Sequence, residues 1–204
     1  VEACPVHDGG VDRFAGIVEH TAFAPAPYDI AIASVNRPTT GYFFLGTSLK
    51  AWMWEEVFAA GYPSSATAVL SDNFRIDARG HKGEILRKVP AGRVLLHPHP
   101  DVIEVSFAIT KGMSGSPLVM RNVLDSTGNP IEQFGLLGVC VGNERSEIVE
   151  HTLTEVIEGG ARFSEKVARV EEYGIVHDLR PLSEWRADGF NGKTLTELIR
   201  PTAE

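Results

Sequence analysis

One stretch of this chain combines a hydroxyl, two glycines and a proline in a spacing that suits nucleophilic chemistry. Residues 110–119 read Thr-Lys-Gly-Met-Ser-Gly-Ser-Pro-Leu-Val. Gly112 can adopt backbone angles that a side chain forbids, so its N–H can turn toward the same point as the N–H of Ser114. Two such donors stabilise the oxyanion that forms when a serine oxygen attacks a carbonyl. The sequence therefore predicts acyl transfer at Ser114, with Gly112 and Ser114 as the oxyanion hole.

The residues around Ser114 help to distinguish a nucleophile loop from an ordinary turn. Gly115 leaves room beside the hydroxyl, and Pro117 stiffens the entry into an apolar strand. A Gly/Ser turn between two strands is the simpler interpretation, because such turns are common in β proteins. The nucleophile elbow of α/β-hydrolases is excluded, since Ser116 stands where that motif needs its last glycine.

A serine nucleophile needs a general base, usually a histidine that a carboxylate orients. Asp29 opens the apolar segment 29–35 (Asp-Ile-Ala-Ile-Ala-Ser-Val), where a carboxylate needs a partner. It precedes Ser114 by 85 residues (114 − 29). The alternative role for Asp29 is that of a strand-capping residue in a turn.

These segments resemble the trypsin-like (chymotrypsin-fold) serine peptidases. Residues 112–117 resemble the family signature Gly-x-Ser-Gly-[Gly/Ser]-Pro, and the Gly-Ser-Pro ending is closest to the bacterial glutamyl-endopeptidase branch. Asp29-Ile-Ala-Ile is similar to the Asp-Ile-Ala-Leu strand that carries the catalytic aspartate. Further landmarks occur in the family's order at residues 55–63, 103–110, 135–142 and 173–177. The resemblance implies a serine endopeptidase that works through an acyl-enzyme, with Ser114 and Asp29 as catalytic residues.

The resemblance also implies an all-β fold of two six-stranded antiparallel β-barrels. We expect residues 1–50 to be the remainder of the N-terminal barrel and residues 51–180 to be the C-terminal barrel. The segment 144–172 is expected to be an insertion, and residues 181–204 a tail with a short helix. The alternative is the same architecture used as a catalytically inactive peptide-binding module.

Local patterns add expectations for single segments. Residues 145–172 have helical character, because Leu153, Val156 and Ile157 follow a helical spacing before a Gly-Gly stop. Short helices are expected near residues 182–187 and 194–199. Residues 6–10 predict a hairpin turn, and residues 79–83 a second turn.

The histidine expected before Asp29 is not identified. Only His7 and His20 precede it. His7 lies in the predicted hairpin turn and His20 is too close to Asp29. Three explanations stay open: a histidine on an N-terminal segment or second chain, a degenerate protease-like fold, or a recruited histidine such as His7. We favour the first, because the chain starts at Val1 rather than Met, and such a segment would also complete the first barrel.

Substrate contacts are expected on both sides of the nucleophile loop. We expect Phe107, Ala108 and Thr110 on one side and Val141, Gly142 and Asn143 on the cleft strand. By spacing, Ala108 is nearest to the position where a trypsin-like pocket holds an acid, which disfavours Arg or Lys. Thr110 suits an acidic side chain, but the acid-preferring branch also uses a histidine that the cleft strand lacks. A small or apolar side chain is therefore expected, in a substrate that adds as a strand along residues 138–143.

Composition excludes several other classes of function. The net charge of −8 argues against nucleic acid or an anionic membrane as the main partner. No apolar run approaches the ~18 residues of a membrane span, and a soluble, cytoplasmic location is the expectation. Cys4 and Cys140 cannot form a four-ligand zinc site and are expected to be buried free thiols. His97 and His99 alternate with prolines, which indicates an exposed loop rather than a metal site, so we expect no metal and no cofactor.

Overall fold

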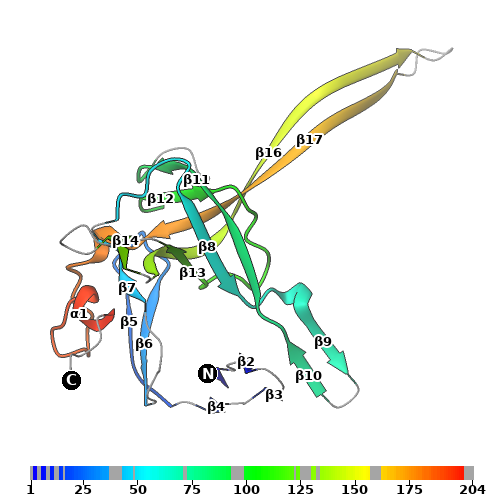
Figure 1. Ribbon diagram of the computed structural model, residues 1–204. Helices are drawn as coiled ribbons and strands as arrows, with labels where there is room; N and C mark the ends of the chain where they lie inside the picture. The colour runs from blue at the N-terminus through cyan, green and yellow to red at the C-terminus, as the bar shows by residue number, and fades with distance from the viewer. Residues whose placement is uncertain are drawn as a thin grey trace.

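The described residues lie mostly in β-strands, with one short α-helix among them, in agreement with the expected all-β class. The computed structural model describes residues 17–36, 43–47, 49–70, 73–92, 99–121, 134–156 and 162–199, together with short strand segments at 2–3, 6–7, 10–11, 14–15, 123–124 and 130–131. Figure 1 shows a central group of strands from which a long two-stranded ribbon extends.

The strands follow one another as β1 (Glu2–Ala3), β2 (Val6–His7), β3 (Gly10–Val11), β4 (Phe14–Ala15), β5 (Val18–Phe23), β6 (Ala31–Val35), β7 (Phe44–Leu45), β8 (Glu56–Gly61), β9 (Thr67–Leu70), β10 (Asn73–Ile76), β11 (Arg79–Val89), β12 (Val102–Val105), β13 (Pro117–Met120), β14 (Val123–Leu124), β15 (Pro130–Ile131), β16 (Gly135–Val156) and β17 (Arg162–Asp178). The helical elements are the 3₁₀ turns η1 (Ser64–Ala66) and η2 (Arg180–Leu182) and the helix α1 (Leu195–Ile199).

Six of the described strands close into a ring. Their hydrogen-bonded order is β13-β8-β11-β12-β17-β16, and β16 pairs again with β13. Every one of these pairings is antiparallel. The short β7 adds to β16 in parallel at one edge. All six strands lie within residues 51–180, the part of the chain expected to form the C-terminal barrel.

Alternating side chains fill this ring with an apolar core. In β8 the buried residues Val57 and Ala59 alternate with more exposed neighbours, as in a strand with one face on the core. They pack with buried side chains of the other strands: Ile85, Ile103, Val105, Leu118, Leu137, Cys140 and Val176. Cys140 is a buried free thiol, as expected; the side chain of Cys4 lies outside the described residues.

The expectation of a helical insertion at residues 145–172 is wrong. β16 and β17 form one continuous hairpin whose strands pair from Gly138↔Asp178 to Val156↔Arg162. Ile148, Val149 and Thr152 are β-branched, and such side chains favour the pleated conformation over the helix. The apolar spacing at residues 153, 156 and 157 therefore did not indicate a helix.

Other local expectations have mixed outcomes. Residues 79–83 are not a turn but the start of β11, where they pair with β8. No helix covers residues 182–187, and η2 ends at Leu182. The helix expected near 194–199 is α1, which starts with a reciprocal capping box. Thr194 N donates to Glu197 Oε2 at 2.7 Å, and Glu197 N donates to Thr194 Oγ1 at 3.3 Å.

The N-terminal part contributes hairpins rather than a closed barrel within the described residues. The hairpin turn expected at residues 6–10 is confirmed by the pairing of Val6 with Val11. β5 and β6 form a two-stranded sheet of their own. This hairpin packs through Tyr28, Ile30 and Ile32 on a second apolar cluster that includes buried residues of β7 and the C-terminal segment: Leu45, Leu179, Leu182 and Leu195.

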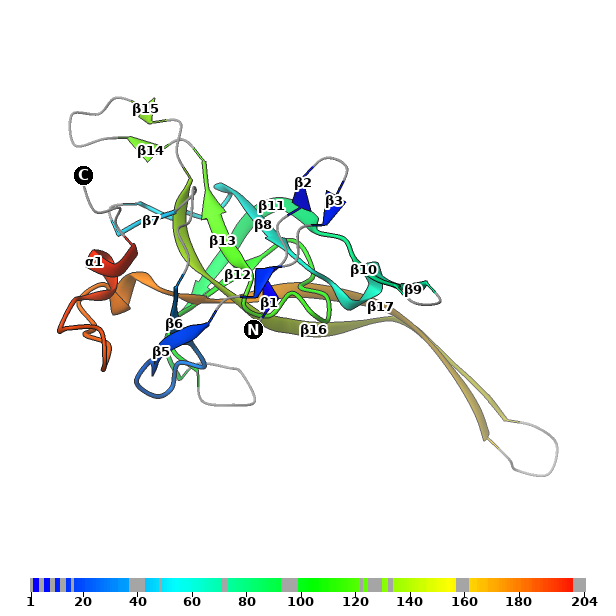
Figure 2. The same ribbon diagram turned by 90° about the horizontal axis from the view of Figure 1, so that it is seen from below.

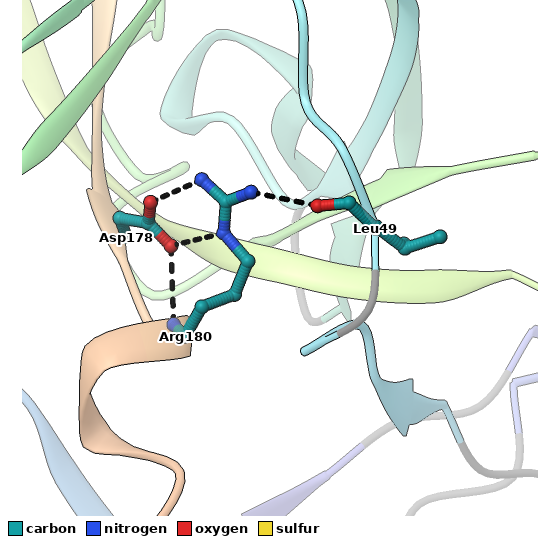
Figure 3. A network of polar contacts seen from close by, with 3 residues as sticks. All are labelled: Leu49, Asp178 and Arg180. Atoms are coloured by element: carbon teal, nitrogen blue, oxygen red, sulfur yellow. Dashed lines mark hydrogen bonds and ion pairs between the residues drawn. The ribbon is translucent and has the colours of Figure 1, made fainter.

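A buried ion pair joins the end of β17 to the segment that precedes β8. Arg180 Nε donates to Asp178 Oδ1 at 2.7 Å, and a second guanidinium nitrogen binds Asp178 Oδ2 (Figure 3). The third nitrogen donates to the carbonyl oxygen of Leu49 at 2.9 Å. A forked Arg–carboxylate pair of this kind fixes direction as well as distance. It connects the end of β17 to the backbone of Leu49, whose side chain lies in the barrel core.

Candidate active site

The loop that carries Ser114 consists of two consecutive tight turns. Met113 N donates to the carbonyl oxygen of Thr110 at 3.0 Å, and Ser116 N donates to that of Met113 at 3.0 Å. The third residue of each turn is a glycine with positive φ, +94° at Gly112 and +89° at Gly115. That position favours glycine in type II turns, because a Cβ disfavours positive φ. Ser114 is thus the second residue of the second turn and directly follows Met113, which both turns share.

Gly112 is required by space as well as by conformation. A Cβ at this position would lie 2.7 Å from both Ser64 N and Tyr62 O, which are backbone atoms that cannot turn aside. A hydrogen bond also connects η1 to the loop, because Ser64 N donates to the carbonyl oxygen of Lys111 at 2.8 Å. On the other side of the loop, Gly115 N donates to the carbonyl oxygen of Cys140 at 2.9 Å. These contacts make the loop rigid on both flanks.

The two predicted oxyanion donors have no competing acceptor in the described part of the chain. No hydrogen bond from Gly112 N or Ser114 N is found there, whereas Met113, Gly115 and Ser116 all use their N–H groups within the loop or to β16. Met113 between the two donors is fully buried and anchors the turn in the core. Two unpaired N–H groups beside a serine are the arrangement that oxyanion stabilisation needs.

Ser114 and Asp29 line the same cavity, although Asp29 belongs to the N-terminal hairpin and Ser114 to a loop of the six-stranded ring. The cavity has a volume of about 240 Å³, and its lining consists of Asp29, Ile30, Ala31, Ser114, Gly115, Val139, Cys140 and Val141. Ser114 is exposed, and its Oγ donates to the carbonyl oxygen of Val141 at 3.2 Å. The hydroxyl is therefore both reachable and directed toward β16.

Asp29 reaches this position because its neighbours are apolar. Tyr28 and Ile30 pack on the second cluster, as Val139 of β16 also does. Asp29 was expected to open the strand, but the strand β6 begins only at Ala31. Asp29 precedes it and is exposed. Its carboxylate forms no hydrogen bond with any described residue, so it remains available to a group that enters the cavity.

His177 is a nearby residue that the sequence analysis did not single out as functional. It lies opposite Val139 in the β16–β17 ladder and is only 7% exposed. Its ring meets the edge of Tyr28 at 6.0 Å, and its Nδ1 is buried without a hydrogen-bond partner among the described residues. Burial lowers the pKa of His177, with a smaller opposing effect from Asp29 and a further lowering by His99. The strand alternation of residues 173–177 was the signal that could have placed this histidine on the outer face.

The predicted substrate contacts separate into two groups. Val141 lines the cavity, but Ala108, Thr110, Gly142 and Asn143 are not among its lining residues. Asn143 instead binds the backbone of Ile109 twice, because its Oδ1 accepts from Ile109 N at 2.5 Å and its Nδ2 donates to Ile109 O at 2.9 Å. Its side chain thus ties β16 to the segment before the nucleophile loop. Phe107 stacks on His81 and packs against the core.

Neither the histidines near the predicted site nor the cysteine in the cavity lining supplies a second nucleophile or an identified base among the described side chains. His99 is buried, contrary to the expected exposed loop, and its Nδ1 lies 2.6 Å from the carbonyl oxygen of Pro100. His97 and the side chain of His7 lie outside the described residues. His20 is exposed and meets Phe190 edge-on. Burial raises the pKa of Cys140 to about 12, so its thiol stays protonated and is no competing nucleophile.

No family model, curated protein or solved structure matches this chain. In the part that the structure describes, none of the helices combines the length and the apolar character needed to cross a membrane. The chemistry of the site therefore has to be argued from its own geometry.

Proposed function

We propose that this chain carries the nucleophile site of a trypsin-like serine endopeptidase. The observation that supports it most is the shared cavity of Ser114 and Asp29, where the N–H groups of Gly112 and Ser114 have no hydrogen-bond partner among the described residues. The six-stranded antiparallel ring is what the resemblance implies for the second of two barrels, and we propose that β5 and β6 belong to the first.

In the proposed reaction, Ser114 Oγ attacks a peptide carbonyl and its proton passes to a histidine that enters the cavity beside Asp29. The N–H groups of Gly112 and Ser114 then stabilise the oxyanion, at on the order of 3 kcal/mol per donor. Asp29 holds the imidazole in the correct tautomer and stabilises its protonated form. The histidine returns the proton to the leaving amine, and water resolves the acyl-enzyme.

The base is proposed to come from outside the described side chains, since no described histidine lines the cavity. The β5–β6 hairpin offers a surface for such a segment, because Ile17, Phe23 and Val35 are exposed on it. An N-terminal segment or a second chain that covers these residues would complete the first barrel and supply the imidazole. His7, on β2, is the alternative source within this sequence.

The substrate is proposed to lie along β16 beyond the point where β13 ends. β13 pairs with β16 as far as Val139, and the carbonyl oxygen of Val141 faces Ser114. A peptide that continues this edge would bring its carbonyl to Ser114 through main-chain hydrogen bonds. Ile30, Val139 and Val141 in the lining support a small or apolar side chain next to the scissile bond.

Reaction with a fluorophosphonate probe tests the proposal, because such probes label activated serines. We expect one adduct on Ser114, located by peptide mass mapping, in the full-length product of the gene. S114A should abolish labelling, and S116A is the matched control, since Ser116 is buried in the same loop. If the full-length protein is never labelled at Ser114, the peptidase proposal is wrong.

A peptide-binding module is the second candidate, favoured by the same absence of a histidine from the described cavity lining. In that case the edge of β16 would bind an extended peptide without cleaving it. Peptide binding that persists in S114A, together with no labelling of the full-length protein, would identify this second function.

A further inference from the structure

The distal part of the β16–β17 hairpin, residues 144–154 and 163–173, is called the arm here. In both views it extends away from the rest of the described chain (Figure 1, Figure 2). An isolated two-stranded hairpin has marginal stability in water, and it needs a further layer on one face to be secure. The arm therefore requires a partner for one of its faces.

Strand register assigns the arm's side chains to two faces. Residues directly opposite each other share a face, and successive residues alternate. Along β17, Phe163, Glu165, Val167 and Arg169 share one face, called the arm face. A bulge between Val149 and His151 keeps this face continuous on β16, and the pairs Ile148↔Arg169, His151↔Val167 and Leu153↔Glu165 complete it.

The arm face carries more exposed apolar surface than a solvated strand needs. Ile148, Leu153, Phe163 and Val167 are between 43% and 54% exposed. Exposed apolar side chains gathered on one face mark an interaction surface. The opposite face exposes Val149 and Val170, and Lys166 and Glu147 already form an ion pair there at 2.6 Å.

We propose that the arm face is the contact between two copies of this chain, related by a two-fold axis through the Val167–His151 pair. This axis lies in the plane between the two stacked arms and runs perpendicular to their strands. It places β17 of one copy over β17 of the other and β16 over β16, with each pair of stacked strands antiparallel. Residues equally distant from Val167 then face each other. Ile148 of each copy packs on Leu153 of the other and Val167 packs on Val167, whereas Phe163 lies opposite Glu171 at the ends of the contact.

Charge selects a second copy as the partner. Glu165 and Arg169 lie two residues before and after Val167, so the axis places each opposite its counterpart of opposite sign in the other copy, twice per dimer. Glu165 has no ion pair in the described part of the chain, whereas Arg169 contacts Glu171 at 2.9 Å on the same face. A surface that matches itself in this way is the mark of an isologous dimer contact. His151 meets its own counterpart beside the axis.

Sedimentation equilibrium of the whole chain tests the dimer and the face that forms it. The wild type is expected to be a dimer at micromolar concentration. V167D should raise the dimer dissociation constant by more than about tenfold, since it buries an unpaired carboxylate at the axis. V149D is the matched control, because Val149 is equally exposed (47% against 49%) but lies on the opposite face, and it should leave the dimer intact.

A charge exchange tests the two-fold relationship itself. E165R alone should weaken the dimer by about tenfold or more, because it sets two arginines against each other. E165R combined with R169E restores opposite charges across the axis and should return the dissociation constant to near the wild-type value. Circular dichroism confirms that each variant is folded.

Three results would overturn the proposal. The first is a wild type that stays monomeric at about 100 micromolar, far above the concentration at which a specific dimer forms. The second is dissociation by V149D that is as strong as that by V167D. The third is a double exchange that dissociates as far as E165R alone.

Discussion

Asp29 and Ser114 stand 85 residues apart in sequence (114 − 29) and line one cavity of about 240 Å³. Asp29 lies in the connection between β5 and β6, where its neighbours Tyr28 and Ile30 make apolar contacts. Ser114 lies on a loop of the closed six-stranded sheet. A carboxylate and a hydroxyl that converge from separate parts of a chain onto one cavity can share a proton carrier placed between them. The proposed chemistry depends on this relationship.

Substitution of Gly112 tests whether the loop conformation is required. G112A should lower the free energy of unfolding by about 1–3 kcal/mol, because alanine is disfavoured at φ +94° and its Cβ would meet backbone atoms at 2.7 Å. It should also abolish fluorophosphonate labelling of Ser114, since the loop must shift. Urea denaturation and labelling rates measure the two effects.

G92A is the matched control for this prediction. Gly92 also has positive φ, +74°, but a Cβ there meets nothing within 4 Å, and it lies far in sequence from Ser114. G92A should cost less stability than G112A and leave labelling unchanged. Equal losses in both variants would show that backbone conformation alone, and not the close approach of Ser64 and Tyr62, requires glycine at position 112.

Asn143 is predicted to act by holding the backbone before the nucleophile loop. N143A removes both hydrogen bonds to Ile109 and should cost about 1–3 kcal/mol of stability, at roughly 0.5–1.5 kcal/mol per bond. N36A provides the comparison, since Asn36 accepts a single exposed hydrogen bond from Ile17 N at 3.1 Å and should cost less. A stable N143A that only loses peptide affinity would instead assign Asn143 to substrate binding.

The sequence predicted the elements whose local chemistry is distinctive. Glycine at position 112 with positive φ followed from the needs of two converging N–H groups, and the strand within residues 55–62 followed from the resemblance of this segment to a family landmark. The arm could not be recognised in the same way. Its mixed charges and scattered apolar residues fit either a helix or a strand, and only the pairing of its two halves with each other decides between them.

The site was also only partly accessible from sequence. Ser114 and Asp29 were found because motif and spacing agreed, and both line the cavity. Asn143 was predicted to contact substrate because it lies on the strand that the resemblance assigns to the cleft, but its amide binds the backbone of Ile109. His177 was missed because its importance comes from burial beside Tyr28, which depends on how the N-terminal hairpin packs on the barrel.

His177 predicts a specific dependence of stability on pH. Burial lowers its pKa below the usual 6.5, although Asp29 opposes this and His99 adds to it. The unfolded chain therefore binds a proton more readily, so the contribution of His177 is fully present above about pH 6.5 and is lost as pH falls through the folded pKa. H177F keeps a ring against Tyr28 and removes the titration.

Urea denaturation between about pH 5 and about pH 7.5 measures this contribution. The free energy of unfolding of the wild type should fall more steeply toward low pH than that of H177F. Parallel curves for the two proteins would show that His177 binds its proton equally well in the folded and unfolded chains.

The central claim is that Ser114 and Asp29 act as one catalytic unit, and a double-mutant cycle on peptide hydrolysis by the full-length protein tests it most directly. S114A and D29N should each lower kcat/KM by at least about a thousandfold, and the double variant should be no slower than S114A, because groups that act together lose their effect together. Losses that multiply, or a D29N protein as active as the wild type, would contradict it.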